Sequence, residues 1–315
     1  MKEVGSQQRP NLFRPSPLAN RDVKQILIFL ACLCVLLPPL TVATDQNELT
    51  EAAAFQPWTG DLDGMIRRRM IRPLVAPSRT SYWHLGFRQT GAEYELLKAF
   101  ENEINEHYKT QGEHIRIYVV IIPTSRDHLI PRLLEGGGDI AAGILTVTPE
   151  RLEKVDFGAP CFRGVKEIAV TGPASPELAS VDDLSGKEVF VRKSSSYWTH
   201  LESLNERFKN EHKPPVTLKA APEDLQDDDL LEMVNAGLVG IVVVDRYQAL
   251  LWAQVFKKLK PHRGVVVNKG GDIAWMIRKD SPKLRAEIGA FAKAYGQKSD
   301  FGQALLKNIP AVGES

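Results

Sequence analysis

Short apolar runs alternate with helical patterns along most of this 315-residue chain, and this alternation limits the possible folds more than any other feature. The apolar runs are rich in β-branched residues, which is typical of buried strands. Residues 92–109 repeat apolar side chains at helical spacing and predict an amphipathic helix. Strands that alternate with helices predict an α/β fold of parallel, doubly wound sheets with right-handed crossovers.

The same patterns predict the other elements and a division of the chain. We expect strands at residues 71–76, 115–122, 140–145, 165–170, 189–191, 240–244, 265–267 and 273–277. We expect further helices at residues 129–134, from 197 onward, at 230–235, at 249–256 and through 284–295. Gly237 is placed to end the helix before it, because glycine adopts the left-handed conformation without steric cost. The Gly- and Pro-containing residues 171–176 separate a first set of strand–helix units from a second set.

The segment from Gly138 to Pro160, GDIAAGILTVTPERLEKVDFGAP, carries the clearest sign of a site. Thr148 is placed to cap a helix that begins at Pro149, since Thr accepts a hydrogen bond there and Pro has no N–H to satisfy. Arg151 falls in the first turn of that helix, where the helix dipole disfavours a cation. An arginine beside free N–H groups at the end of a strand indicates an anion site, in the place where open α/β sheets bind ligands.

This segment resembles the signature of the bacterial extracellular solute-binding proteins of the amino-acid type. Further resemblance lies in LLEGGGDIAA, DDLSGKEVFVRKSSSYW, DLLEMVNAGL, VVVDRYQALLWAQVF and GGDIAWMIRKDSP. Over residues 62–310 the chain is similar to the solute-binding-like domain of the membrane-bound lytic murein transglycosylase F family. The resemblance implies a type II periplasmic-binding-protein-like fold, in which two lobes, each a doubly wound sheet, are joined by a two-strand hinge.

The resemblance and the composition together predict the division of the chain. We expect a signal peptide or N-terminal anchor at residues 1–43, a linker at 44–61, the first part of lobe 1 at 62–171, lobe 2 at 172–262, and a return to lobe 1 with a C-terminal tail at 263–315. Arg21 and Lys24 precede an apolar run at residues 26–37, which a Pro pair and small residues follow. The run is shorter than the ~20 residues that a spanning helix needs, so we expect export to the periplasm. An uncleaved anchor formed by residues 26–37 is the alternative.

The resemblance implies that a ligand's α-carboxylate is held from both lobes. Arg151 binds it through its planar fork, and Thr146 and Thr148 assist. Ser195 and Ser196, between a strand and a helix, meet the same carboxylate from the second lobe. Each residue has a simpler alternative: Arg151 pairs with a nearby surface acid, and the hydroxyl residues only cap helices or form turns.

The ligand's α-ammonium group would be received by Asp245. This residue follows the apolar run 240–244 and therefore sits at the carboxyl end of a strand. A half-buried carboxylate needs a cationic partner, and the adjacent Arg246 is the alternative partner. Together, Arg151 and Asp245 would form a clamp for a zwitterion.

Three further side chains are candidates for lining the cleft. Tyr82 and Trp83 come just after the first expected strand and would stack on a ligand, or else pack in the core or between the lobes. Glu95 matches an acidic position of the family at the start of the first long helix, which implies that it lines the cleft.

Charge and motif content exclude several classes of function. The formal net charge is +1, from 40 basic and 39 acidic residues, and no basic patch is interleaved with aromatic residues, which argues against nucleic acid as a partner. The seven histidines lack metal-ligand spacing, and CxxC, GxSxG and Walker motifs are absent, so we expect no metal and no cofactor. The acidic run Asp227–Asp229 is typical of a solvated helix start.

Cysteine usage fits an exported chain. Cys32 and Cys34 lie in the N-terminal apolar run, so Cys161 alone remains in the exported part and forms no intramolecular disulfide. We expect Cys161 to be a small buried hydrophobic residue rather than a catalytic thiol.

The combined expectation is a monomeric, exported solute-binding protein that closes over a small zwitterion, either an amino acid or a peptidoglycan peptide fragment. Its partner would be an ABC permease, for uptake, or a cell-wall enzyme, for sensing. The alternative is a regulatory module of peptidoglycan turnover. In the transglycosylase family a second domain carries the catalytic Glu. Here Glu314-Ser315 resembles the Glu-Ser pair of that domain's motif, a match that we attribute to chance, so we expect no enzyme activity.

Overall fold

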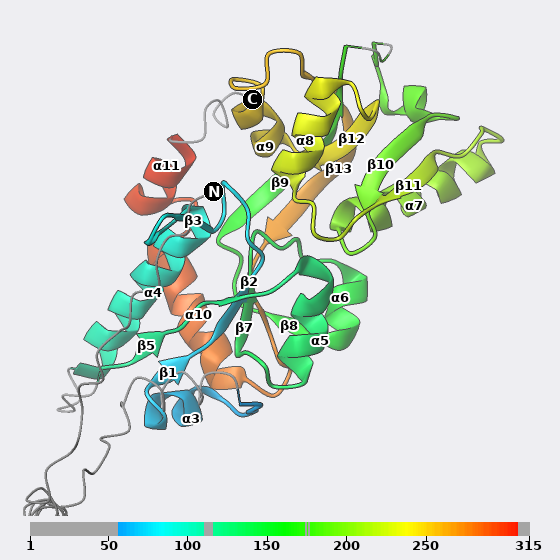
Figure 1. The fold of residues 1–315 in the computed structure, drawn as a ribbon. Helices are drawn as coiled ribbons and strands as arrows, with labels where there is room; N and C mark the ends of the chain where they lie inside the picture. The colour runs from blue at the N-terminus through cyan, green and yellow to red at the C-terminus, as the bar shows by residue number, and fades with distance from the viewer. Residues whose placement is uncertain (1–55, 110–115, 174, 176, 308–315) are drawn as a thin grey trace, which may run out of the picture. The chain divides into compact units, whose positions relative to one another are not determined.

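Two five-stranded sheets, each with helices around it, form two lobes (Figure 1). The computed structural model describes residues 56–109, 116–173, 175 and 177–307. The predicted signal segment or anchor, Cys32, Cys34, most of the predicted linker and residues 308–315 lie outside the described residues. Within the described part, no helix combines the length and the apolar character needed to cross a membrane.

Lobe 1 contains most of the first half of the chain. Its sheet has the order β6 (Ile122–Pro123), β2 (Pro73–Val75), β7 (Ile140–Ala142), β14 (Met276–Ile277) and β8 (Asp156–Phe157). Two smaller sheets pair β1 (Met70–Ile71) with β5 (Tyr118–Val119), and β3 (Trp83–Leu85) with β4 (Arg88–Thr90). Its helices are α3 (Leu62–Arg67), α4 (Ala92–Lys109), the 3₁₀ turn η1 (Arg126–His128), α5 (Leu129–Leu134), α6 (Pro149–Lys154), α10 (Pro282–Tyr295) and α11 (Asp300–Lys307).

Lobe 2 is formed by one continuous stretch of chain, residues 162–273. Its sheet has the order β11 (Thr217–Ala221), β10 (Glu188–Arg192), β12 (Ile241–Asp245), β9 (Phe162–Thr171) and β13 (Lys260–Ile273). Its helices are the 3₁₀ turn η2 (Val181–Leu184), α7 (Ser196–Asn210), α8 (Asp227–Ala236) and α9 (Arg246–Trp252). Lobe 2 has its own apolar core, which is separate from the two clusters of lobe 1.

The strands β9 and β13 connect the lobes and make the expected two-strand hinge (Figure 1). Both belong to the lobe 2 sheet, and near lobe 1 they remain paired, with Phe162 opposite Ile273. The predicted lobe boundaries, at residues 171/172 and 262/263, fall at the end of β9 and inside β13. The prediction of a two-lobed type II fold is confirmed.

The prediction that the sheets are parallel is wrong, because both sheets are mixed. In lobe 2, β9 runs antiparallel to β12 and β13, and in lobe 1, β14 runs antiparallel to β7 and β8. The reversed strands β9 and β14 lie next to the crossings between lobes. Strands that are connected by a helix within one lobe all enter the sheet at the same end. A strand next to a crossing between lobes enters at the other end and therefore runs antiparallel to them.

Several local predictions are confirmed. The helix α4 has the predicted bounds, 92–109. Thr148 caps α6, its Oγ1 accepting from the Arg151 N–H at 3.4 Å, and Pro149 is the first helical residue. Gly237 ends α8 with φ +78°, as its conformational freedom predicts.

The start of lobe 1 differs from the prediction. Residues 56–61, which were expected to belong to a linker, pack on lobe 1: the Trp58 N–H donates to the Gly136 carbonyl at 2.9 Å. The expected strand at 71–76 is divided at Arg72, which is fully buried and forms an ion pair with Asp139 at 3.2 Å. A charged side chain is buried at low cost only when it is paired, and the partner of Arg72 lies far away in the sequence. The local pattern of apolar residues therefore does not predict this break in the strand.

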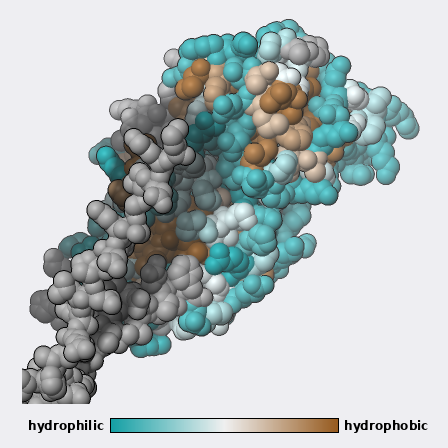
Figure 2. All heavy atoms as spheres, viewed as in Figure 1, coloured by the Kyte–Doolittle hydropathy of each residue, from teal (hydrophilic) through white to brown (hydrophobic). Residues whose placement is uncertain are grey.

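The surface in Figure 2 is mostly hydrophilic over the described residues, with hydrophobic residues gathered in a patch over lobe 2. The largest exposed apolar side chains of lobe 1 belong to the hairpin formed by β3 and β4, where Leu85 and Phe87 are exposed. This hairpin was not predicted, because its strand residues are exposed and lack the alternation of apolar and polar side chains that identifies a half-buried strand.

Candidate functional site

A cavity of about 470 Å³ is lined by residues of both lobes. From lobe 1 it receives the turn that follows β7 and the first turn of α6; from lobe 2 it receives the turn between β10 and α7. All five residues that the sequence predicts to hold a carboxylate line it: Thr146, Thr148, Arg151, Ser195 and Ser196.

The backbone before this turn is strained and is held by a buried acid. Ile144 has φ +58°, a left-handed conformation that a β-branched residue rarely adopts. The Glu93 carboxylate accepts hydrogen bonds from the N–H groups of Gly143 and Ile144, at 3.1 and 3.2 Å. This contact fixes the turn that carries Thr146 into the cavity.

Arg151 bridges the two lobes without pairing to a carboxylate. Its Nη1 donates to the Thr146 carbonyl at 2.7 Å, and its Nη2 donates across the lobes to the Ser194 carbonyl at 2.9 Å. Among the described residues it makes no ion pair within 4 Å, and one of the acids close to it in sequence, Asp156, pairs with Arg285 at 2.9 Å. Burial, followed by the positive charge of Arg126, lowers the pKa of Arg151 to about 10. The guanidinium therefore faces neutral oxygens in a place that suits an anion.

The two serines of lobe 2 have different tasks. The Ser195 hydroxyl caps α7, accepting from the Trp198 N–H at 3.3 Å and donating to the Arg192 carbonyl at 2.7 Å. The Ser196 hydroxyl donates to Glu167 Oε1 at 2.9 Å and lies 3.2 Å from Thr146 Oγ1 of the other lobe. Ser195 therefore fills the capping role that the sequence left open, and Ser196 is the hydroxyl at the contact between lobes.

Asp245 lies at the end of β12, as the sequence predicts, but does not line the 470 Å³ cavity. It is 2% exposed, and its Oδ1 has no hydrogen-bond partner among the described residues. Burial, then the negative charges of Glu167 and Asp227, raise the pKa of this carboxyl well above its ordinary value. No ion pair joins Asp245 to the adjacent Arg246 in the described part of the chain, so this buried acid lacks a cation.

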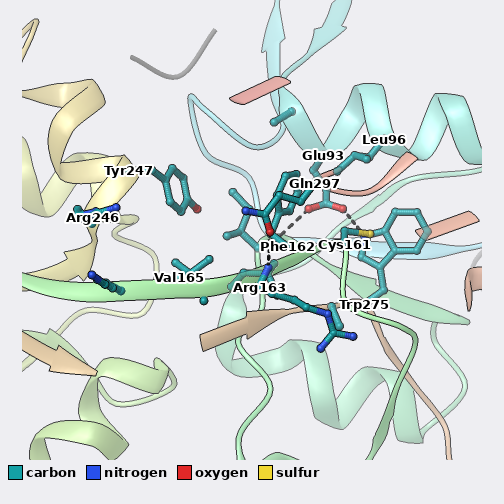
Figure 3. A pocket seen from close by; sticks show the side chains of 16 residues that line it. Glu93, Leu96, Cys161, Phe162, Arg163, Val165, Arg246, Tyr247, Trp275 and Gln297 are labelled. Atoms are coloured by element: carbon teal, nitrogen blue, oxygen red, sulfur yellow. Dashed lines mark hydrogen bonds between the residues drawn. The ribbon is translucent and has the colours of Figure 1, made fainter. Parts of the chain in front are cut away.

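A second cavity, of about 170 Å³, also takes residues from both lobes (Figure 3). Glu93 of α4 and Trp275 lie on the lobe 1 side, where the Trp275 Nε1–H donates to the Glu93 carboxylate. Tyr247 and Arg246 approach from α9 of lobe 2. The Tyr247 hydroxyl is buried and has no partner among the described residues. Burial raises the pKa of Glu93 above its ordinary range.

The remaining predicted residues lie outside both cavities. Tyr82 is 2% exposed and packs in the lobe 1 core, edge-on to His84. Trp83 is 46% exposed on β3. Glu95 is exposed on α4, and the buried acid at the start of this helix is instead Glu93, two residues earlier.

The prediction of a solvated acidic run at Asp227–Asp229 is wrong for its first two members. Asp227 is buried, lines the larger cavity and pairs with Arg192 at 2.5 Å. Burial opposes its ionisation, but the charges of Arg192 and then Arg126 lower its pKa below the ordinary value. Asp228 is 3% exposed and pairs with Arg79 of lobe 1 at 2.7 Å.

Arg126 is a charged cavity residue that the sequence analysis missed. It opens η1, just after β6, at the edge where parallel strands end, which is the position that draws attention to Arg151 and Asp245. The same rule applied to residues 122–126 identifies it. In the described residues, no cluster of His, Cys, Asp and Glu side chains suits a metal ion.

Comparison with known proteins supports the fold and the family. The family model for bacterial extracellular solute-binding proteins, family 3, matches residues 81–308. The membrane-bound lytic murein transglycosylase F of Desulfosudis oleivorans is 25% identical over 240 residues, which cover 76% of this chain and 48% of that protein. The protein of the same name from Saccharophagus degradans is 26% identical over 240 residues, covering 75% of this chain and 43% of its own length. This chain thus spans about half the length of these curated relatives or less.

Solved structures share the fold at low identity. An ancestral arginine-binding protein bound to arginine has a TM-score of 0.62 at 21% identity, covering 77% of this chain and 98% of its own. The amino acid ABC transporter substrate-binding protein AbpA from Streptococcus pneumoniae, bound to L-arginine, has a TM-score of 0.64 at 18% identity, covering 79% and 97%. The two lobes, the two-strand hinge and the family match over residues 81–308 agree: this chain belongs to the bacterial extracellular solute-binding proteins, family 3.

Proposed function

We propose that this protein closes over a small zwitterionic ligand, an amino acid or a peptidoglycan peptide fragment. Arg151 and Ser196 would hold the α-carboxylate, with Thr146, Thr148 and Ser195 shaping the turns around it. Asp245 would receive the α-ammonium group. One observation carries the proposal: among the described residues, Arg151 donates only to carbonyl oxygens and Asp245 has an unpartnered Oδ1, so two ionisable groups of opposite sign, one from each lobe, make no ion pair.

Closure follows from contacts with both lobes. A ligand that touches Arg151 on lobe 1 and Ser196 on lobe 2 binds the closed form more tightly than the open form, and so shifts the population toward closure. The lobes already meet through Arg151 and the Ser194 carbonyl, which is the contact that a carboxylate would share or replace.

The family supports an exported, periplasmic location, and the solved neighbours with amino acid ligands support an amino acid. Delivery to an ABC permease is the role proposed first. The relatives named as lytic transglycosylases support the second candidate, a regulatory module of peptidoglycan turnover. In either role we propose binding without catalysis, and a murein zymogram of the purified chain should therefore be blank.

Calorimetric titration tests the ligand class. The purified protein is titrated with L-amino acids and with peptidoglycan stem peptides. Arg151→Ala should weaken binding by about 100-fold, the order of magnitude of a lost charge-assisted contact. Arg207→Ala, which removes an exposed arginine paired with Asp182 inside lobe 2, is the matched control and should bind normally. Absence of binding by the unmodified protein, or full binding by Arg151→Ala, contradicts the proposal.

Partner capture separates the two roles. A tagged, ligand-loaded chain is incubated with envelope extract, and retained proteins are identified by mass spectrometry. Recovery of permease subunits supports uptake, and recovery of murein-cleaving enzymes supports regulation.

A further inference from the structure

A second guanidinium faces the same cavity as Arg151. Arg126 and Arg151 both line the 470 Å³ space between the lobes. Arg126 Nε donates to Gln226 Oε1 of lobe 2 at 2.8 Å, and its Nη1 donates to the Gly143 carbonyl of lobe 1 at 3.0 Å. Like Arg151, it makes no ion pair within 4 Å among the described residues and is hydrogen-bonded to neutral oxygens alone.

The acids around the cavity are too few or already engaged. Its lining includes five basic residues, Arg126, Arg151, Lys154, Arg192 and Lys193, and three acidic residues, Asp127, Glu150 and Asp227. Arg192 and Asp227 pair with each other, and Asp227 also accepts from the Tyr197 hydroxyl at 3.0 Å. Asp127 lies 3.2 Å from His128. Apart from the Arg192–Asp227 pair, the cavity lining therefore contains four basic residues and only two acidic residues.

A single carboxylate cannot compensate two arginines that are held on different elements. The α-carboxylate of the proposed zwitterion, placed on Arg151, would leave Arg126 facing carbonyl and amide oxygens. Like charges that are brought together in a partly buried space disfavour one another, and burial followed by the Arg192 charge lowers the pKa of Arg126. A second anionic group on the ligand would remove this cost.

We propose that the ligand carries two anionic groups, and that Arg126 binds the second one. This inference rests on the proposed function, because it assigns the α-carboxylate to Arg151. The ligand class is then a zwitterion with an additional carboxylate: an acidic amino acid, or a stem peptide fragment with a free side-chain or second terminal carboxylate. A ligand with a cationic side chain is disfavoured at this position, since it would lie against Arg126.

Matched acid and amide probes test the second anion. L-glutamate is compared with L-glutamine, and L-Ala-D-Glu, with two free carboxylates, is compared with L-Ala-D-isoglutamine, which has one. In calorimetric titration, at least one acid should bind about ten-fold or more tightly than its amide, because the amide loses a charge-assisted contact with Arg126.

Variants assign the preference to the residue. Arg126→Met should lower the ratio of acid to amide affinity from about ten-fold to about one. Arg126→Lys keeps the charge but loses the fork, and should retain a reduced preference. Lys193→Met, which removes another cavity-lining cation, is the control for a general loss of charge and should keep the preference. Circular dichroism establishes that each variant is folded.

The outcomes separate this inference from the proposed function. If amides bind as tightly as acids, or if Arg126→Met keeps the preference, the second-anion site is overturned while zwitterion binding stands. If other amino acids bind but none of these four probes does, the second-anion site is likewise overturned. If no amino acid and no stem peptide binds to the unmodified protein, the proposed function fails, and the inference fails with it.

Discussion

At the scale of single residues, Asp245 shows most clearly that a side chain suited to bind a ligand can lower the stability of the ligand-free protein. A buried carboxyl with an unpartnered Oδ1, near Glu167 and Asp227, costs free energy that folding alone does not recover. Its raised pKa means that the native state binds more protons than the unfolded state above the ordinary carboxyl pKa. The free energy of unfolding therefore falls as the pH rises from about 4 toward the raised pKa. Residues of this kind are usually retained for a ligand.

We expect Asp245→Asn to stabilise the ligand-free protein by about 1 kcal/mol or more at pH 7, since it removes a buried carboxyl whose ionisation is disfavoured by burial. The stability gap between variant and unmodified protein should widen as the pH rises from 4 to 7, and amino acid binding should be lost. Thermal unfolding across this pH range and calorimetric titration measure the two effects. A destabilised variant that still binds would contradict the assigned role.

Cys161 offers an independent test of burial. It is 6% exposed and lines the smaller cavity, and burial, then the Glu93 charge, raise its pKa to about 12. At pH 8 the thiolate fraction is then on the order of one in ten thousand, and the thiolate is the reactive form. Iodoacetamide should leave the Cys161 peptide unmodified in native protein and label it in urea, as read by mass spectrometry. Rapid labelling of the native protein would contradict this burial.

At the scale of secondary-structure elements, an ion-pair cluster joins the loop after β2 to α8. Arg79 of lobe 1 pairs with Asp228 at 2.7 Å and with Glu232 at 2.9 Å, and its guanidinium carbon lies 4.9 Å from the centre of a Trp252 ring. This cluster, which we call the Arg79 latch, joins the lobes through contacts that do not include Arg151. Its arginine is about one-third exposed, so its strength depends on salt.

Removal of the Arg79 latch should favour the open form. We expect Arg79→Ala to weaken binding of a zwitterionic ligand by about two- to five-fold, since a partly exposed cluster contributes modestly to closure. It should also raise the radius of gyration of the ligand-free protein in X-ray scattering. Arg207→Ala, whose ion pair stays within lobe 2, should change neither quantity. An unchanged affinity and radius for Arg79→Ala would show that the latch does not hold the lobes.

Local rules predicted the elements that depend on neighbours in sequence. The cap at Thr148, the length of α4 and the end of α8 at Gly237 each follow from a few adjacent residues. The resemblance assigned Arg151 and Ser196 to one ligand, and both line the same cavity although they lie 45 positions apart in the chain.

Features that depend on distant charges were not predictable in this way. Asp227 is buried because Arg192 pairs with it from 35 positions away, and Arg72 is buried because Asp139 pairs with it. The periodicity of apolar residues carries no information on such pairs, and for this reason the sequence predicts a solvated Asp227. Whether Asp245 and Arg151 grip one ligand stays a prediction, since Asp245 lies outside the cavity that Arg151 lines.

At the scale of the whole protein, separate cores make each lobe a candidate unit of unfolding. The core of lobe 2 shares no member with the clusters of lobe 1, and the contacts between lobes described above are polar. Domains with weak interfaces unfold in more than one step, whereas a ligand bound to both couples them.

We therefore expect calorimetric unfolding without ligand to depart from two-state behaviour, with a ratio of calorimetric to van't Hoff enthalpy above 1. A saturating ligand, at about 100 times its Kd, should add about 2.7 kcal/mol of stability and bring the ratio closer to 1. A ratio of 1 in both conditions would indicate a single cooperative unit.

The position of β14 has a consequence for biosynthesis. This strand, Met276–Ile277, lies between β7 and β8 and bridges the middle of the lobe 1 sheet, although the whole of lobe 2 precedes it in the chain. A ribosome therefore releases every strand of the later lobe before it delivers the one that completes the earlier lobe. Lobe 1 is therefore begun first and completed last, and until β14 arrives the facing edges of β7 and β8 lack their partner strand. Unpaired strand edges of this kind are prone to aggregation.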